Sequence, residues 1–144
     1  MSLASSAAIL VAGPTASGKS ALAAMLAEGL NGTVINADAM QVYRNLPILT
    51  AQPDDALRAT APHKLYAEIP PSQAFSAGQW LAAARQAQQE ARSAGRVPIL
   101  CGGTGMYFQS LINGLAEIPD IPDALRSRLR ADYDRLGERA IRAL

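Results

Sequence analysis

Eight consecutive residues near the start of the chain have the types and spacing that bind phosphate groups. They are Gly13, Pro14, Thr15, Ala16, Ser17, Gly18, Lys19 and Ser20. In the spacing G-x-x-x-x-G-K-[ST], backbone N–H groups of a glycine-rich turn surround a diphosphate and lysine adds a positive charge. The hydroxyl of Ser20 can ligate Mg²⁺. The motif therefore predicts a diphosphate site, and it leaves open which molecule carries the diphosphate.

A carboxylate follows the next apolar stretch of the chain. Asp38 ends "TVINAD", which is β-branched and apolar and predicts a short strand over Thr33–Asp38. In an open α/β sheet the carboxyl ends of the strands share one rim, so Asp38 should lie beside the phosphate loop as a magnesium ligand or a general base. The alternative is a strand-end turn residue. Gln41, Tyr43 and Arg44 then offer groups that contact an unstacked base, or simply form a polar loop.

A third apolar stretch, "VPILC", ends in the glycine-rich "GGTG". An ATP-using kinase should have an acidic magnesium ligand at the end of such a strand, and none is present here, which weakens an ATP reading. The glycines could form only a tight strand-to-helix turn. Thr104 would nevertheless place a hydroxyl at the same rim.

The elements that position these residues follow from hydrophobic patterning. Residues 7–12, "AAILVA", read as a strand buried on both faces of a parallel sheet, and helix formers follow Gly18. Ser76 and Gln79 have capping-box spacing at the start of a helix that Gly95 should end. The segment 47–62 is expected to be loop with at most a short helix, "KLYAEIPP" can hold a short strand, and an arginine-rich amphipathic helix should begin near Asp123.

Composition sets further limits. The 144 residues contain 49% hydrophobic residues, enough for the core of one domain, and a formal net charge of +1 excludes a global basic field for nucleic acid. The single cysteine, Cys101, is expected to be a buried strand residue and fits a reducing cytoplasm. His63 is expected in a loop rather than in a metal or catalytic site. No stretch predicts a signal peptide or membrane span.

Several motifs in this order resemble the tRNA dimethylallyltransferase family, also called tRNA isopentenyltransferases. They are "GPTASGKSALA", "INADAMQVYRNLPILTAQP", "PHKLY", "FSAGQW" and "GRVPILCGGTGMYFQSLINGL", and the match runs from about Ile9 to Arg130. The resemblance implies an α/β fold, a P-loop NTPase-like parallel sheet flanked by helices, with the start of a helical insertion. It assigns residues 1–118 to the N-terminal portion of the catalytic core and 119–144 to the start of the helical tRNA-binding insertion.

The implied reaction transfers a dimethylallyl group from dimethylallyl diphosphate to the exocyclic amine of the adenosine 3′ of the tRNA anticodon. The loop of residues 13–20 would bind the prenyl diphosphate, with Lys19 catalytic and Ser20 toward Mg²⁺, the implied cofactor. Asp38 corresponds to the general base. Asp38, Ala39, Met40, Gln41, Thr104 and Arg126 correspond to the residues that bind tRNA, and Thr104 is also placed at the catalytic centre.

Two departures from the family pattern are visible, Ala39 in place of a serine and Gln52 in place of a lysine. The partners implied are a tRNA anticodon stem-loop and dimethylallyl diphosphate, with no membrane, and the protein is expected to be a cytoplasmic monomer. Because family members are longer, we expect a 144-residue fragment to be inactive by itself. The alternatives are a P-loop small-molecule kinase using ATP, a transferase acting on free adenine nucleotides, and a non-catalytic nucleotide- or RNA-binding remnant.

Overall fold

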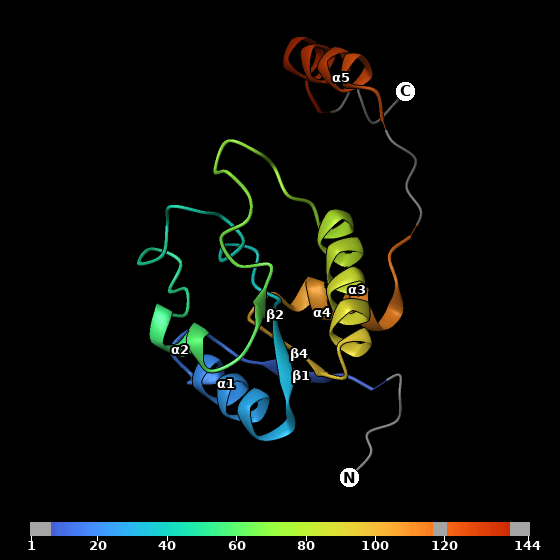
Figure 1. Ribbon diagram of the computed structural model, residues 1–144. Coiled ribbons are helices and arrows are strands. Elements are labelled where there is room, and N and C mark those ends of the chain that lie inside the picture. Colours follow the sequence, from blue (N-terminus) through green and yellow to red (C-terminus); the bar gives the residue numbers. More distant parts are fainter. Residues whose placement is uncertain (1–6, 117–120, 139–144) are drawn as a thin grey trace.

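A four-stranded parallel sheet forms the centre of the protein (Figure 1). The structure is a computed structural model that describes residues 7–116 and 121–138. The strands are β1 (Ile9–Ala12), β2 (Gly32–Asn36), β3 (His63–Lys64) and β4 (Val97–Gly102), in the order β1-β4-β2-β3. The helices are α1 (Lys19–Leu30), α2 (Asp55–Ala59), α3 (Ala77–Ser93), α4 (Gly105–Asn113) and α5 (Asp123–Leu136). The predicted α/β class with a parallel sheet is confirmed.

Helices cover both faces of this sheet, and strand alternation separates the two cores. Val34 and Ile99 pack with α1, whereas Ile35 and Leu100 pack with α3 and α4 on the opposite face. Because successive side chains of a strand point to opposite faces, a strand buried on both sides reads as an unbroken apolar run. β4 is such a strand, and Cys101 is buried at its end, as predicted.

The first strand differs from the prediction. β1 begins at Ile9 rather than Ala7, and Leu10 is 39% exposed, so the expected burial on both faces is wrong for the residues described. The physical reason is its position in the sheet. β4 is its only neighbour in the described parts of the chain, and Val11 is the single buried residue of the strand.

The segment between β2 and α3 is mostly irregular, as expected. It contains the short helix α2, which the Asp54 side chain caps by accepting from Leu57 N–H.

β2 ends at Asn36, so Asp38 lies two residues beyond the strand rather than inside it. His63 is a correction, because it begins β3 and pairs with Val34 instead of lying in a loop. Burial lowers its pKa.

The helix ends follow the sequence signals. Ser76 Oγ accepts from Gln79 N–H and Gln79 Oε1 accepts from Ser76 N–H, which is the predicted capping box. Gly95 has φ 69° just after α3, where a left-handed residue ends a helix. The arginine-rich helix α5 begins at Asp123 and has no buried residue. The boundary expected near residue 118 lies outside the described residues and stays a prediction.

One close approach of two backbones fixes the geometry at the rim of the sheet. Ala37, just past β2, donates its N–H to Cys101 O at 2.8 Å and accepts from Thr104 N–H at 3.2 Å. The chain thus crosses directly over Gly102, where a Cβ atom would lie 2.1 Å from both C and O of Ala37. Only glycine leaves room for this crossing.

Replacing Gly102 with alanine should therefore unfold the protein at lower urea concentration. The overpacked backbone contact should cost about 1–3 kcal/mol or more, because both partners are main chain held by hydrogen bonds. Gly105→Ala is the matched control, since a Cβ there meets nothing within 4 Å and its φ is not left-handed. Equal urea midpoints for the two variants would contradict the packing role of Gly102.

Candidate functional site

The predicted phosphate loop joins β1 to α1, and its last two residues, Lys19 and Ser20, begin the helix. Gly18 takes φ 81° as the N-terminal cap residue of α1, and Lys19 begins the helix. A left-handed residue at this point suits glycine. Lys19 Nζ donates to Pro14 O at 3.0 Å, so the ammonium lies folded over the loop. The free N–H groups and positive dipole at the start of α1 make this turn suited to an anion.

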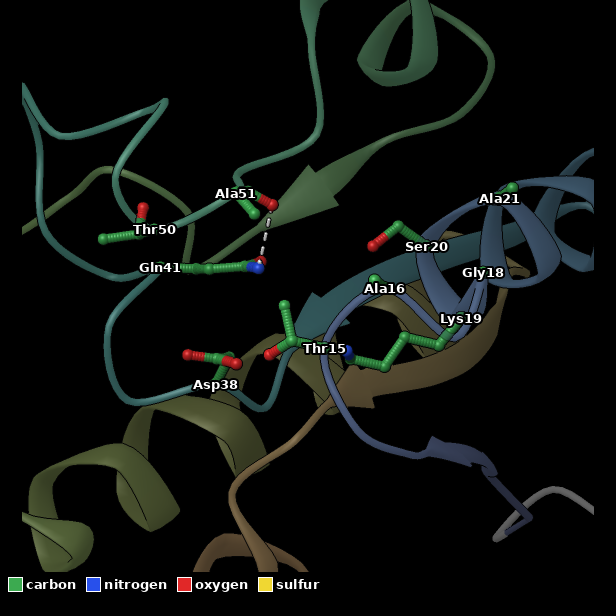
Figure 2. A pocket seen from close by; sticks show the side chains of 10 residues that line it. All are labelled: Thr15, Ala16, Gly18, Lys19, Ser20, Ala21, Asp38, Gln41, Thr50 and Ala51. Carbon is green, nitrogen blue, oxygen red and sulfur yellow. Dashed lines mark hydrogen bonds between the residues drawn. The ribbon is translucent and has the colours of Figure 1, made fainter.

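A cavity of about 220 Å³ opens between this loop and the segment that follows β2. Its lining residues are Thr15, Ala16, Gly18, Lys19, Ser20, Ala21, Asp38, Gln41, Thr50 and Ala51. In Figure 2, Thr15 and Lys19 lie on the loop side, while Asp38 and Gln41 approach from the segment after β2. The structure therefore brings five of the eight predicted phosphate-binding residues and the predicted general base to one cavity, whereas Gly13, Pro14 and Ser17 are not part of its lining.

Asp38 sits in a tight turn, residues 37–40, that we call the Asp38 turn. Its carboxylate Oδ1 accepts from Met40 N–H at 2.9 Å. Within the described residues, Oδ2 accepts no hydrogen bond. A methyl group at Gly103 would lie 3.6 Å from Oδ2 and 3.3 Å from Gly13 O, so Gly103 lies between Asp38 and the phosphate loop. One carboxylate oxygen is held and the other is left available to a ligand.

Thr104 lies against the Asp38 turn rather than in the cavity lining. Its Oγ1 accepts from Ala39 N–H at 2.9 Å, which leaves the hydroxyl proton free to donate elsewhere. Thr104 is also the residue before α4, and its side chain makes no helix cap. The threonine thus links the end of β4 to the turn that carries the carboxylate.

Gln41 lines the cavity but is already engaged with protein. Its Nε2 donates to Ala51 O at 3.0 Å (Figure 2). The Gln52 side chain bonds to the backbone of the same segment: its Nε2 donates to Gln41 O at 3.1 Å and to Tyr43 O at 2.7 Å. At the position where the family pattern has a lysine, this neutral amide closes the intervening loop. Met40, the residue before Gln41, is 51% exposed and is not part of the cavity lining.

Arg126 does not lie with the residues that line the cavity. It lies on α5, none of whose described residues is buried. Its predicted contact with tRNA stays a prediction.

Several residues that shape the site were not predicted from the sequence. Asn36, at the end of β2, is fully buried and bonds the Asp38 turn. Thr50 and Ala51 form part of the cavity wall. Asparagine is rarely buried, so its place at the end of an apolar strand was a signal that could have been noticed. Nothing in the pattern indicated that Thr50 and Ala51 would fold back.

Aromatic side chains pack beneath the Asp38 turn. The rings of Trp80 and Tyr107 stack with centroids 4.2 Å apart, and Trp80 Nε1 donates to Asn36 O at 2.8 Å. Burial raises the pKa of Tyr107, and the neighbouring Tyr43 and Asp38 raise it further. Both rings are buried in the cluster that also contains Ala37, so they give one side of the turn an apolar support.

Comparison with known proteins finds one matching family model and many similar sequences. A family model described as IPP transferase matches residues 41–144. A tRNA dimethylallyltransferase of Rhodopseudomonas palustris is 53% identical over 137 residues, covering 95% of this chain and 43% of the relative. The corresponding enzyme of Methylocella silvestris is 56% identical over 124 residues, covering 86% of this chain and 41% of the relative.

The chain belongs to the IPP transferase family.

Solved structures of this family agree with the fold. The full-length tRNA isopentenylpyrophosphate transferase of Bacillus halodurans matches with a TM-score of 0.74 and 35% identity, covering 92% of this chain and 44% of that one. A eukaryotic dimethylallyltransferase acting on tRNA matches with a TM-score of 0.76 and 30% identity, covering 91% and 32%. The P-loop NTPase-like fold predicted from the sequence is confirmed.

The chain spans less than half the length of these IPP transferase relatives. Among the residues that the structure describes, no helix combines the length and the apolar character needed to span a membrane.

The thiol of Cys101 should be unreactive in the folded protein. Burial raises its pKa, with Lys19 and Ser20 opposing the shift, and its Sγ lies 3.5 Å from Lys19 O. At pH 8, iodoacetamide should label the native thiol at least about tenfold more slowly than the urea-unfolded thiol, because both access and thiolate formation are reduced. Labelling at equal rates in the two states would contradict this placement.

Proposed function

We propose that this chain forms part of the catalytic core of a tRNA dimethylallyltransferase. The reaction transfers a dimethylallyl group from dimethylallyl diphosphate to the exocyclic amine of the adenosine 3′ of the tRNA anticodon and releases diphosphate. The observation that carries the proposal is the shared cavity, which has the predicted phosphate loop on one side and the Asp38 carboxylate on the other. Relatives named for this activity support the choice of reaction.

The loop side would hold the leaving group. The N–H groups at the start of α1 and the Lys19 ammonium would bind the diphosphate oxygens, after Nζ leaves its contact with Pro14 O. As the bond between the prenyl carbon and the diphosphate oxygen breaks, its electron pair remains on oxygen. These positive groups then interact more strongly, which stabilises the transition state more than the bound substrate.

The donor set also fits the proposed Mg²⁺ ion. The Ser20 hydroxyl, an oxygen ligand, lines the cavity on the side of the phosphate loop. Mg²⁺ commonly takes one or two protein oxygens together with substrate phosphates and water. Bound there, the ion would neutralise charge on the diphosphate. No cluster of three or more acidic, histidine or cysteine side chains suited to a metal occurs in the described parts of the chain.

Asp38 would act on the acceptor. An adenine exocyclic amine is a weak nucleophile because its lone pair is delocalised into the ring. If Asp38 Oδ2 takes one amine proton as nitrogen bonds to the prenyl carbon, the product nitrogen stays neutral and the carboxylate becomes a carboxylic acid. Oδ1 is held by Met40 N–H, so the free oxygen has a fixed direction.

The acceptor adenosine would leave its stack to reach this cavity. Unstacking costs less in a single-stranded loop than in a duplex, which favours the tRNA anticodon stem-loop as substrate. Met40, Gln41 and Thr104 would contact the adenosine near Asp38, and Arg126 on the exposed α5 would contact phosphate groups farther away. The expected monomeric state and cytoplasmic location stay predictions.

Lys19→Ala in the full-length protein should raise KM for dimethylallyl diphosphate by about 10- to 100-fold, because a charge-assisted hydrogen bond to the diphosphate is lost. The control is Lys64→Ala, which removes an exposed lysine paired with Glu90 away from the cavity. Steady-state kinetics with varied prenyl diphosphate measures the effect. An unchanged KM for Lys19→Ala would remove this lysine from the donor site.

Asp38→Asn should lower kcat by about a hundredfold or more while leaving prenyl diphosphate affinity nearly unchanged, because only the proton acceptor is lost. Asp55→Asn, at an exposed acid in the first turn of α2, is the matched control. Single-turnover transfer and equilibrium binding measure the two quantities separately. Turnover within a fewfold of the unsubstituted protein would refute a base role for Asp38.

The acceptor can be tested by competition. Unmodified tRNA, an anticodon stem-loop and AMP are offered separately with labelled dimethylallyl diphosphate and Mg²⁺. The proposal predicts label in tRNA and in the stem-loop, with little in AMP. Preferential labelling of AMP would instead favour a transferase for free nucleotides, and binding of tRNA without any transfer would favour a non-catalytic protein.

A further inference from the structure

Asn36 is a buried polar side chain that neither the family pattern nor the proposed reaction assigns a role. It is the last residue of β2, with 0% exposure, among the apolar side chains of the sheet. Burial of an amide is unfavourable unless its donors and acceptor find partners. All of the partners found here are backbone groups, and two of them belong to Asp38.

The Asn36 amide holds Asp38 on both sides. Its Oδ1 accepts from Asp38 N–H at 2.8 Å, and its Nδ2 donates to Asp38 O at 2.9 Å. A residue whose N–H and C=O are both fixed has little freedom left in φ and ψ. The direction of its Cα–Cβ bond is then set, and Met40 N–H on Oδ1 sets the carboxylate plane.

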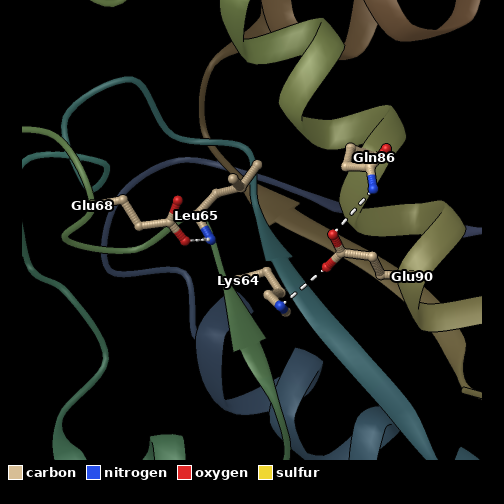
Figure 3. A network of polar contacts seen from close by, with 5 residues as sticks. All are labelled: Lys64, Leu65, Glu68, Gln86 and Glu90. Carbon is tan, nitrogen blue, oxygen red and sulfur yellow. Dashed lines mark hydrogen bonds and ion pairs between the residues drawn. The ribbon is translucent and has the colours of Figure 1, made fainter.

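The same amide ties the Asp38 turn to a second segment. The other Nδ2 hydrogen bonds to Leu65 O at 3.0 Å. Leu65 has φ 64°, and its own N–H is held by Glu68 Oε1 at 2.7 Å (Figure 3). Beyond Leu65 the chain donates from Ala67 N–H to Gln41 O at 3.0 Å, so this segment also supports a residue that lines the cavity.

The backbone of Asn36 is fixed from the other face. Trp80 on α3 donates its indole N–H to Asn36 O at 2.8 Å, and Trp80 is itself fully buried. The asparagine is thereby anchored to the packed sheet and helix. It can pass that rigidity to the half-exposed turn, which is also held by the crossing at Gly102, by the Thr104 hydroxyl and by the bond from Met40 N–H to Asp38 Oδ1.

We propose that Asn36 is a positioning residue that sets the direction of the Asp38 carboxylate for proton abstraction. The proposal rests on the base role proposed above for Asp38. Among residues of this length, only asparagine offers a donor and an acceptor together at the reach of one neighbouring turn. Aspartate would lack the two donors, and leucine would leave three backbone groups of the described residues without their partner.

The test uses the full-length protein and a double-mutant cycle of Asn36→Ala and Asp38→Asn. Asn36→Ala alone should lower kcat by about 10- to 100-fold through misplacement of the base, with KM for dimethylallyl diphosphate changed less than about twofold. Because Asn36 acts through Asp38, the double variant should be no slower than Asp38→Asn alone.

Two further variants separate positioning from loss of fold. Val34→Ala, two residues earlier in the same strand and 1% exposed, should lower the thermal midpoint but retain kcat. Asn36→Ser, whose hydroxyl can still bond within the turn, should recover part of kcat. It also replaces Asn36→Ala in the cycle if the alanine variant does not fold, as judged by circular dichroism.

The outcomes are distinct. The positioning role would be overturned if the kcat of the double variant fell by the product of the two single losses. It would also be overturned if Val34→Ala lowered kcat as much as Asn36→Ala does. Either result would leave Asp38 as the base. A rise in KM with kcat retained would also overturn the positioning role. Normal turnover by Asp38→Asn alone would overturn the base role itself and the inference with it.

Discussion

The crossing of the chain over Gly102 is the contact on which the site depends. Ala37 bonds to Cys101 O and Thr104 N–H on either side of a glycine that has no room for a Cβ. β4 is an interior strand, paired with β1 on one side and with β2 on the other. This crossing therefore brings the ends of three strands, and the loops that leave them, to one point on the rim. The phosphate loop leaves β1, the Asp38 turn leaves β2, and Thr104 follows β4.

The two walls of the cavity carry groups of opposite chemical character. The loop before α1 presents N–H groups and an ammonium, and the Asp38 turn presents a carboxylate oxygen without a hydrogen bond in the described chain. Positive groups on one wall suit a departing diphosphate, and the carboxylate opposite suits the proton of an attacking amine. The stacked rings of Trp80 and Tyr107 pack in the core that also contains Ala37 of the turn, and the two walls line one cavity.

Much of this arrangement could be predicted from the sequence because the signals are local. The phosphate loop, the capping box at Ser76, the helix end at Gly95 and the buried run of β4 each depend on a few adjacent residues. The exposure of Leu10 could not be predicted, because it depends on which strands lie beside β1. The bonds of Asn36 to Leu65 and of Gln52 to Gln41 were equally out of reach, since they join residues 29 and 11 positions apart through a loop fold that no periodicity encodes.

The central claim is that the diphosphate in this loop belongs to a prenyl donor and leaves during transfer. The most direct measurement is a single-turnover reaction of the full-length protein with unmodified tRNA, Mg²⁺ and either dimethylallyl diphosphate or ATP, each labelled in the group it would transfer. The account predicts that the prenyl label enters an adenosine of the tRNA, with one diphosphate released per label and no requirement for ATP. Transfer of the terminal phosphate of ATP, with the prenyl label remaining on its diphosphate, would contradict it.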